Sequence, residues 1–287
     1  MSAPLIINQL FAGVVSGAIL VFLALGLTLI FGLMSVINFA HGSFFMLGAY
    51  VGFVMLGLTR NFWPGVVVVP LAIGLLGIVV ERTLIKPLYA RTGFDTLLVT
   101  FGLTYVTVEA ARIIWGKVGK PLDPPPELKG GLNLGLFTFP TYLIFLLLAA
   151  VVVIVLLYLL LERTDIGLVI RGGTQDSTMV QVLGIDFARA RIVVFALGTA
   201  LAGLGGVLAA PIQGVNPDLG QNILIMSFVV VVVGGMGSFW GAVASGLLIG
   251  VVVSMTGLWF PPLSQIVVFV LMAVVLLLRP RGLFGRV

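Results

Sequence analysis

The stretch INFAHGSFFMLGAY at residues 37–50 places Asn38, His41 and Ser43 between two long apolar runs. A bilayer offers no water to hydrogen-bond free backbone groups. A helix break at membrane depth therefore persists only where protein buries it or where it lines a cavity. A polar, glycine-containing break between two apolar runs is typical of a transport pathway or a binding site.

The composition is that of a protein embedded in lipid. Of the 287 residues, 60% are hydrophobic and 9% are charged, whereas a soluble domain typically carries about 25% charged residues. Several apolar runs reach the roughly 20 residues that a spanning helix requires. We therefore expect one transmembrane domain over residues 1–287, an all-α bundle of about eight to ten transmembrane segments with broken or half helices. The segments are expected at 7–33, 43–58, 64–80, 95–112, 139–161, 191–212, 221–235, 240–257 and 263–278.

Lysine and arginine give the expected orientation, because cytoplasmic loops carry an excess of these residues. The net charge of +5 is gathered in short clusters between apolar runs, which indicates topology and not a nucleic-acid surface. With the N-terminus outside, three clusters and the C-terminus lie in the cytoplasm. The loop 113–138 opposes this orientation, since it would be external yet contains three lysines. The clusters are Arg82, Lys86 and Arg91; Arg163, Arg171, Arg189 and Arg191; and Arg279, Arg281 and Arg286.

The sequence contains a weak internal echo. The triplet Gly42-Ser43-Phe44 recurs as Gly237-Ser238-Phe239, after a second, glycine-rich break. The apolar run before that break, 223–233, is too short to span alone. Two interrupted segments in matching positions predict an internal repeat, with glycine-rich helix packing as the alternative. Two GxxxG spacings, Gly13/Gly17 and Gly246/Gly250, predict close helix packing.

The candidate pathway residues are small or polar groups at the two breaks and on one face of segment 95–112. A free helix N-terminus near Ser43 would attract an anionic substrate group; alternatively, the polar side chains only satisfy backbone groups. For the threonines, packing is favoured over lining a pathway, because their hydroxyls can bond the backbone of their own helix. A proton relay through His41 is disfavoured, because no acidic residue lies nearby in the sequence. The set is Asn38, His41, Gly42, Ser43, Thr100, Thr104, Gly234, Gly235, Gly237 and Ser238.

The loop 162–190 is the most polar part of the chain. Within it, Thr174 is expected to cap a helix of about ten residues that Gly184 ends. Such a helix is too short to cross a membrane. Its apolar stripe would either lie on the membrane or dock a partner protein, and docking is favoured. The candidate coupling residues are Arg171, Thr174, Asp176, Met179, Val180, Leu183 and Gly184.

The sequence offers no catalytic constellation. One histidine and no cysteine give no metal site, and HExxH, GxSxG and phosphate-binding P-loop motifs are all missing. We expect neither enzyme activity nor a bound metal or cofactor, and any ATP would be hydrolysed by another chain. A stand-alone secondary transporter or channel is the alternative function. The scarcity of ionisable groups within the apolar runs disfavours proton coupling but not sodium coupling.

Four stretches resemble the branched-chain amino acid permease family of ABC importers, LivH type, and the similarity covers nearly the whole chain. They are GLTLIFGLMSVINFAHGSFFMLGAY at 26–50, Arg171 through Gly-Ile-Asp at 184–186, ALAGLGGVLAAPIQGVNPDLG at 200–220 and VVGGMGSFWGAVASGLLIG at 232–250. The resemblance implies an all-helical permease in the cytoplasmic membrane of a prokaryote. Its implied partners are a LivM-like second permease, two LivG/LivF-like ATPases and an external substrate-binding protein, with 174–183 as the coupling helix.

One residue departs from the family pattern. Many members have glutamate after the His-Gly pair, whereas this chain has Ser43. The change removes a charge next to the expected pathway and leaves the substrate open. Leucine, isoleucine and valine are the leading candidates, and other amino acids, short amides, urea and aromatic acids are alternatives. Whether the partner permease is a homologue or a second copy of this chain is also open.

Overall fold

The computed structural model describes residues 3–89, 91–133 and 138–285, which are almost entirely helical. The helices are α1 (Ala3–Met34), α2 (His41–Thr59), α3 (Trp63–Val80), α4 (Gly93–Trp115), α5 (Thr141–Arg163), α6 (Asp165–Gln175), α7 (Ser177–Val182), α8 (Phe187–Gln213), α9 (Leu219–Gly234), α10 (Phe239–Trp259) and α11 (Ile266–Leu278). A π-helical turn, η1 (Glu81–Ile85), and the 3₁₀ turn η2 (Lys86–Leu88) extend α3; further 3₁₀ turns are η3 (Pro126–Leu128) and η4 (Pro261–Leu263). Strands β1 (Gly131–Asn133) and β2 (Thr138–Pro140) form an antiparallel hairpin with Leu132 opposite Phe139.

Each expected apolar segment corresponds to a helix, so the all-α membrane bundle is confirmed. In the described part of the chain, 7 helices are long and apolar enough to cross a membrane. Two further apolar helices are shorter, α9 with 16 residues and α11 with 13. The first break lies earlier than expected. It covers residues 35–40, and His41, Gly42 and Ser43 form the first turn of α2. Ser35, with a φ of 51°, ends α1 in the left-handed conformation that terminates many helices.

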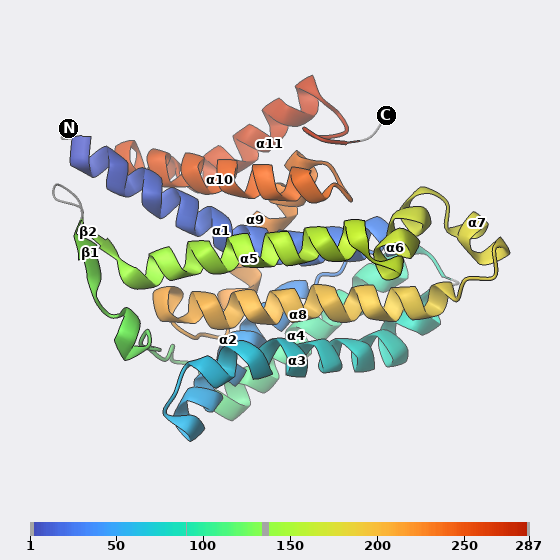
Figure 1. Cartoon of the computed structure of the whole chain (residues 1–287), viewed down its shortest axis with the longest axis horizontal. Helices are drawn as coiled ribbons and strands as arrows, with labels where there is room; N and C mark the ends of the chain where they lie inside the picture. The colour runs from blue at the N-terminus through green and yellow to red at the C-terminus, as the bar shows by residue number, and fades with distance from the viewer. Residues whose placement is uncertain (1–2, 90, 134–137, 286–287) are drawn as a thin grey trace.

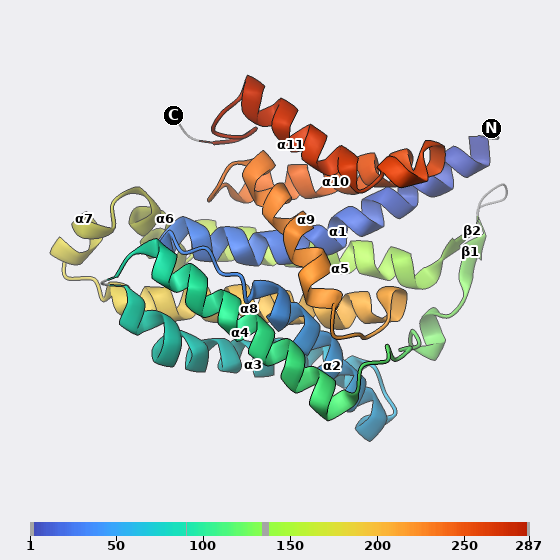
Figure 2. The ribbon, with the colours of Figure 1, turned by 180° about the vertical axis from the view of Figure 1, so that it is seen from behind.

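The bundle has two distinct ends, which Figures 1 and 2 show from opposite sides. The hairpin end carries the N-terminus, β1 and β2, and the α7 end carries α6, α7 and the C-terminal segment. Helices α1 and α3 run from the hairpin end to the α7 end, and α4 runs back. Helices α8 and α10 run from the α7 end to the hairpin end, opposite to α1 and α3, and α11 returns to the α7 end.

The helices form two halves with the same order and opposite directions. Helices α1–α4 make the first half and α8–α11 the second, each with a long helix, a break, a shorter helix and two more helices. The packing follows the same symmetry. The contact of α1, in the first half, with α10 corresponds to the contact of α8, in the second half, with α3. In the same way, the contact between α2 and α8 corresponds to the contact between α9 and α1. The structure is therefore an inverted repeat, and α5–α7 connect its halves.

The register of the repeat differs from the one that the Gly-Ser-Phe triplets suggest. Gly42 is the second residue of α2 and Gly220 the second residue of α9, and an asparagine precedes each by four residues, Asn38 and Asn216. A Cβ on Gly42 would lie 2.2 Å from the carbonyl oxygen of Gly220, and a Cβ on Gly220 would lie 2.4 Å from the carbonyl oxygen of Gly42. The two glycines thus pack reciprocally at the centre of the repeat.

The triplets themselves occupy non-equivalent positions. Gly42-Ser43-Phe44 begins the second helix of its half, whereas Gly237-Ser238-Phe239 precedes the third helix, α10. The counterpart of Phe239-Trp240 is Phe62-Trp63 at the start of α3. Both aromatic pairs are T-shaped, with interplanar angles of 85° and 78°. The short triplet repeats by coincidence of composition, because glycine and serine favour helix starts generally.

The close helix packing expected at the two GxxxG motifs is confirmed, and the structure shows that the motifs pack against each other. Gly13 and Gly17 of α1 meet Gly246 and Gly250 of α10, and a Cβ on Gly250 would lie 2.3 Å from the backbone nitrogen of Gly17. Near the hairpin end, the Gln9 side chain donates to the Ser254 carbonyl (2.9 Å), and the Ser254 hydroxyl donates to the Gln9 carbonyl (2.7 Å). Close backbone approach and this reciprocal pair fix α1 against α10.

We expect Gly250→Ala to destabilise the bundle, because the added methyl group meets backbone atoms that cannot rotate away. Overpacking of this kind typically costs about 1–3 kcal/mol. The matched control is Gly102→Ala in α4, where an added Cβ meets nothing within 4 Å and helix propensity alone favours alanine. Thermal unfolding in detergent measures both variants. An unfolding temperature for Gly250→Ala equal to that of the control would contradict the close packing of α1 and α10.

Candidate transport pathway and coupling segment

Three polar side chains of the first break are buried in the centre of the bundle. Asn38 and His41 have no exposed surface, and Ser43 has almost none. Nε2 of His41 lies 3.2 Å from the carbonyl oxygen of Leu23 in α1. Within the described residues, both amide atoms of Asn38, Nδ1 of His41 and Oγ of Ser43 have no hydrogen-bond partner. Buried polar groups are nearly always paired, so these unpaired atoms make the first break a candidate binding site.

The helix starts at both breaks lack side-chain caps. Ala40 precedes α2 and Asp218 precedes α9, and in the described part of the chain neither residue makes a side-chain cap bond to its helix. The two starts meet at the Gly42–Gly220 contact. The first amides of a helix carry partial positive charge and have no partner within the helix. The centre of the repeat therefore combines two positive helix ends with unpaired neutral polar groups and no carboxylate on residues 35–43.

The candidate threonines of α4 support the first break. The Thr100 hydroxyl accepts from the amide of Phe39 at 3.2 Å and donates within α4 to the Leu97 carbonyl at 3.1 Å. The Thr104 hydroxyl donates to the Thr100 carbonyl at 3.0 Å. Thr100 thus satisfies a free backbone group of the break, the structural role considered as the alternative for polar residues there.

The glycine-rich second candidate break lies away from the first, at the α7 end. The C-terminal segment covers part of it, because the amides of Leu283 and Phe284 donate to the carbonyls of Val233 (2.8 Å) and Gly234 (3.0 Å). Gly235 also touches that segment. The Ser238 hydroxyl caps α10 by accepting from the amide of Gly241. The structure therefore places Gly234 and Gly235 in packing, with a left-handed φ of 99° at Gly235.

A cavity of about 610 Å³ at the α7 end joins residues that the sequence assigned to separate sites. Gly237 and Ser238 line it together with Arg171 and Thr174 of α6. The first break faces this cavity only through Ser35, so Asn38, His41 and Ser43 lie outside its lining. Eight of the ten pathway candidates thus divide between the centre of the repeat, the supporting face of α4 and this cavity, and Gly234 and Gly235 pack against the C-terminal segment instead.

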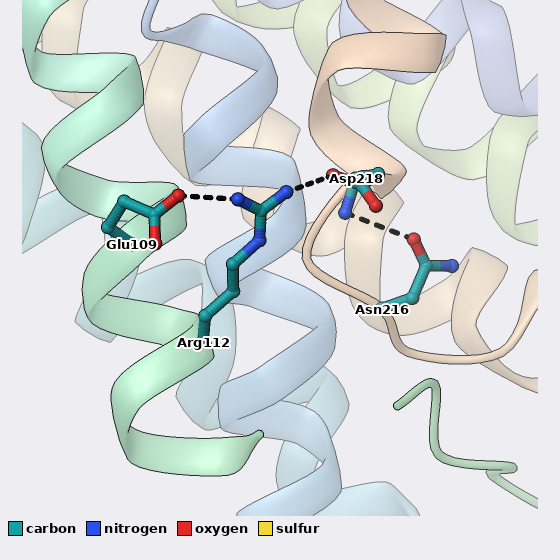
Figure 3. Close-up of polar contacts among 4 residues, drawn as sticks. All are labelled: Glu109, Arg112, Asn216 and Asp218. Carbon is teal, nitrogen blue, oxygen red and sulfur yellow. Dashed lines mark hydrogen bonds and ion pairs between the residues drawn. The ribbon is translucent and has the colours of Figure 1, made fainter. Parts of the chain in front are cut away.

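Sequence reasoning missed the second break of the repeat, residues 214–218. The backbones of Lys120 and Val215 exchange two hydrogen bonds, of 2.8 and 2.9 Å, so the segment after α4 covers this break. Arg112, near the end of α4, bonds Glu109 and reaches Asp218 at 2.8 Å (Figure 3). The Asn216 side chain accepts from the amide of Asp218. The Asn-x-x-x-Gly spacing is shared by 38–42 and 216–220 but also occurs at 61–65, so it identifies this break only together with the Gly42–Gly220 contact.

The polar loop contains two helices in place of the one expected. Thr164 caps α6 by accepting from the amide of Gly167, and Asp176 caps α7 by accepting from the amides of Thr178 and Met179 at 2.9 Å. The expectation that Thr174 caps a helix is wrong, since its hydroxyl donates to the Arg171 carbonyl inside α6. An aspartate caps as well as a threonine, and Asp176 reaches two amides. Gly184, at a φ of 78°, ends α7 as expected.

The apolar side chains of α7 do not share one face. Val180 is 7% exposed and lies against Gly172 of α6, whereas Met179 and Leu183 are 56% and 70% exposed. Val182, which the sequence analysis omitted, is 76% exposed. The exposed apolar surface of this end is therefore Met179, Val182 and Leu183, and Val180 holds α7 to α6. Arg171 is not part of this exposed apolar surface, because its side chain forms an ion pair with Glu162 at 3.1 Å.

The basic clusters gather at the α7 end. The Arg191 guanidinium lies over the ring of Tyr89, 4.2 Å from its centroid, which joins the cluster after α3 to the one before α8. Arg279 and Arg281 follow α11, which ends at the same end. Arg286 lies outside the described residues. The lysines of the 113–138 loop lie at the hairpin end, where Lys129 pairs with Asp123 at 2.8 Å.

Several known proteins are similar in sequence to this chain over most of its length. The high-affinity branched-chain amino acid transport system permease protein BraD of Pseudomonas aeruginosa is 29% identical, over 98% of this chain and 96% of its own. LivH of Escherichia coli, with the same description, is 27% identical over 98% of this chain and 96% of its own. LivM of the same organism is 27% identical over 92% of this chain and 67% of its own. No solved structure matches the chain.

The match to a protein family extends over nearly the whole bundle. The family model described as "Branched-chain amino acid transport system / permease component" matches residues 9–276. This range includes both breaks, both GxxxG motifs and the α6–α7 segment. The chain is a multi-pass membrane protein and belongs to the branched-chain amino acid transport system permease component family.

Proposed function

We propose that this chain is the membrane-spanning permease subunit of an ABC importer for branched-chain amino acids or closely related solutes. The observation that carries the proposal is the meeting of two uncapped helix starts, α2 and α9, at the Gly42–Gly220 contact in the centre of an inverted repeat. Interrupted helices at the interface of inverted repeats form substrate sites in transporters. The names of the relatives support the solute class.

In this proposal the first break lines the substrate path. The amide of Asn38, the imidazole of His41 and the hydroxyl of Ser43 have unpaired atoms that can bond the polar end of an amino acid. The positive start of α2 favours the carboxylate of that amino acid. A neutral residue at position 43 fits this role, because a glutamate there would compete with the substrate carboxylate for the same helix start. Gly42 supplies close backbone approach, and Thr100 and Thr104 support the break.

The α7 end is the cytoplasmic end in this proposal. Most of the described basic residues lie there, which supports that side by the positive-inside rule. The exposed apolar side chains of Met179, Val182 and Leu183 would dock into an ATPase, with Asp176 and Gly184 fixing the ends of α7. Arg171 and Thr174 would carry the movement of α7 into the bundle through the cavity that they line. The C-terminus is then cytoplasmic, in the inner membrane of a prokaryotic cell.

The remaining subunits follow from the same proposal. Two cytoplasmic ATPases would bind and hydrolyse ATP, so this chain itself needs no cofactor and catalyses no reaction. A second permease related to LivM would complete the membrane part, and an external binding protein would deliver substrate at the hairpin end. Both LivH and LivM resemble this chain over most of its length, which supports a pair of homologous permeases.

Ser43→Ala tests the pathway role with little structural effect. The Ser43 hydroxyl has no partner to lose, so we expect unchanged or slightly higher thermal stability. A lost hydrogen bond to a charged substrate group is typically worth about 1.5–3 kcal/mol, which predicts uptake lower by roughly 10- to 100-fold at limiting substrate. The measurement is uptake of labelled leucine by cells or proteoliposomes, normalised to assembled complex.

Ser245→Ala is the matched control. This buried serine donates to the Val230 carbonyl at 2.7 Å and is far from the first break in the chain. Its removal should lower stability by about 0.5–1.5 kcal/mol and leave normalised uptake unchanged. Normal uptake by Ser43→Ala would exclude this hydroxyl from the pathway.

Val182→Asp tests the docking surface. A charge on this exposed side chain should leave the fold intact and prevent apolar docking, so ATPase subunits should no longer co-purify with the chain. Val180→Asp should instead lower thermal stability, because this side chain is buried against α6. Full recovery of the ATPases with Val182→Asp would place the docking surface elsewhere.

A further inference from the structure

The cavity at the α7 end is partly open and is lined by five parts of the chain. They are the second half of α1, the end of α5, helix α6, the segment that leads into α10, and Phe284 of the C-terminal segment. Its volume of about 610 Å³ falls in the range of roughly 300–1,000 Å³ that is typical of small-molecule pockets. These elements converge at the end where α5 meets α6 (Figure 1).

An ion pair forms part of the wall. Nη1 of Arg171 lies 3.1 Å from Oε2 of Glu162, and both residues line the cavity. Arg171 also donates to the carbonyl of Leu161, which fixes its guanidinium. A guanidinium has five N–H donors and a carboxylate has two acceptor oxygens. Each partner therefore keeps bonding capacity for a further charged group after the ion pair forms.

The rest of the wall mixes apolar and aromatic side chains with polar groups, namely Thr28, Ser35, Thr174, Gln175 and Ser238. The Thr28 hydroxyl is buried and has no hydrogen-bond partner within the described residues. The Ser238 hydroxyl accepts the cap bond of α10 and can still donate. The apolar side chains of the lining include Leu25, Leu29, Phe31, Tyr158, Phe239 and Trp240.

We propose that this cavity binds a zwitterionic amino acid with an apolar side chain. Its carboxylate pairs with Arg171, its ammonium group pairs with Glu162, and its side chain packs among the leucines and aromatic rings. The Thr28 hydroxyl gains its missing partner. Neighbouring charges of opposite sign select for a molecule that carries both charges on one carbon, and neither a simple carboxylate nor a simple amine satisfies both.

This site deepens the proposed function, on which it rests, and it differs from the first break. Arg171 and Thr174 belong to α6, which packs on α7. An amino acid bound here touches α6, and α6 in turn packs on the helix proposed to contact the ATPases. The cavity is then the site from which the amino acid leaves on the cytoplasmic side, and its occupancy is sensed by α6.

The experiment is equilibrium binding to the full chain in lipid nanodiscs, measured by calorimetry. The probes are L-leucine, 4-methylpentanoate, which lacks the ammonium group, and 3-methylbutylamine, which lacks the carboxylate. We expect Glu162→Gln to weaken the binding of L-leucine at this site at least tenfold. Both truncated probes should bind the unaltered chain at least tenfold more weakly than L-leucine does. Thr28→Val, which loses no existing hydrogen bond, should weaken binding several-fold without changing the unfolding temperature.

Glu109→Gln is the matched control, because Glu109 also pairs with an arginine but lies near the end of α4 at the hairpin end. It should bind L-leucine as the unaltered chain does. Unchanged binding by both Glu162→Gln and Thr28→Val would overturn the inference, and so would 4-methylpentanoate binding as tightly as L-leucine. Absence of leucine uptake by the complete complex would overturn the proposed function instead, whatever the binding result.

Discussion

The structure depends on the requirement that a chain break inside a bilayer be sealed by protein. The two breaks of the repeat meet this requirement by packing their helix starts against each other, with Gly42 and Gly220 in backbone contact. Side chains larger than hydrogen would separate the starts and admit lipid to unpaired amides. Thr100 and the segment around Lys120 then satisfy the remaining backbone groups from outside. The same packing leaves the side-chain polar atoms of Asn38 and Ser43 without hydrogen-bond partners. A packed core avoids such unpaired atoms because they destabilise the fold, whereas a binding site can pair them with its ligand.

The sequence predicted the parts of the fold that depend on patterns along the chain, such as the length of an apolar run or the spacing of glycines. Apolar length located the membrane helices, and the GxxxG spacings identified residues of close packing, although not that α1 and α10 are the two partners. The register of the repeat was not predictable from the Gly-Ser-Phe triplets, because short motifs of helix-start residues recur without symmetry. The better signal, asparagine four residues before glycine, gains its meaning only from the contact between Gly42 and Gly220. Val180 shows a similar limit: a helix of six residues has too little periodicity to tell the face that packs on α6 from the exposed one.

For the candidate sites, the sequence supplied residues but not their grouping. Arg171 and Ser238 are far apart in the chain, and their common cavity depends on how α6 and α10 approach α1. The distribution of lysine and arginine predicted the basic end of the molecule. This signal is summed over several loops, so a few basic residues at the other end do not change the result. Unpaired buried atoms, such as the hydroxyl of Thr28, have no counterpart in a sequence pattern. They emerge only when every neighbour of a side chain is known.

The contact between α1 and α10 has a consequence for how the chain is made. Gln9 and Ser254, which bond each other near the hairpin end, are separated by 245 residues. At translation rates of about 5–20 residues per second, α1 leaves the ribosome roughly 12–50 s before its main partner exists. During that interval its glycine face lies against lipid or against a membrane chaperone. Helix α1 is therefore synthesised well before α10, and it reaches its final packing only after α10 has followed it into the membrane.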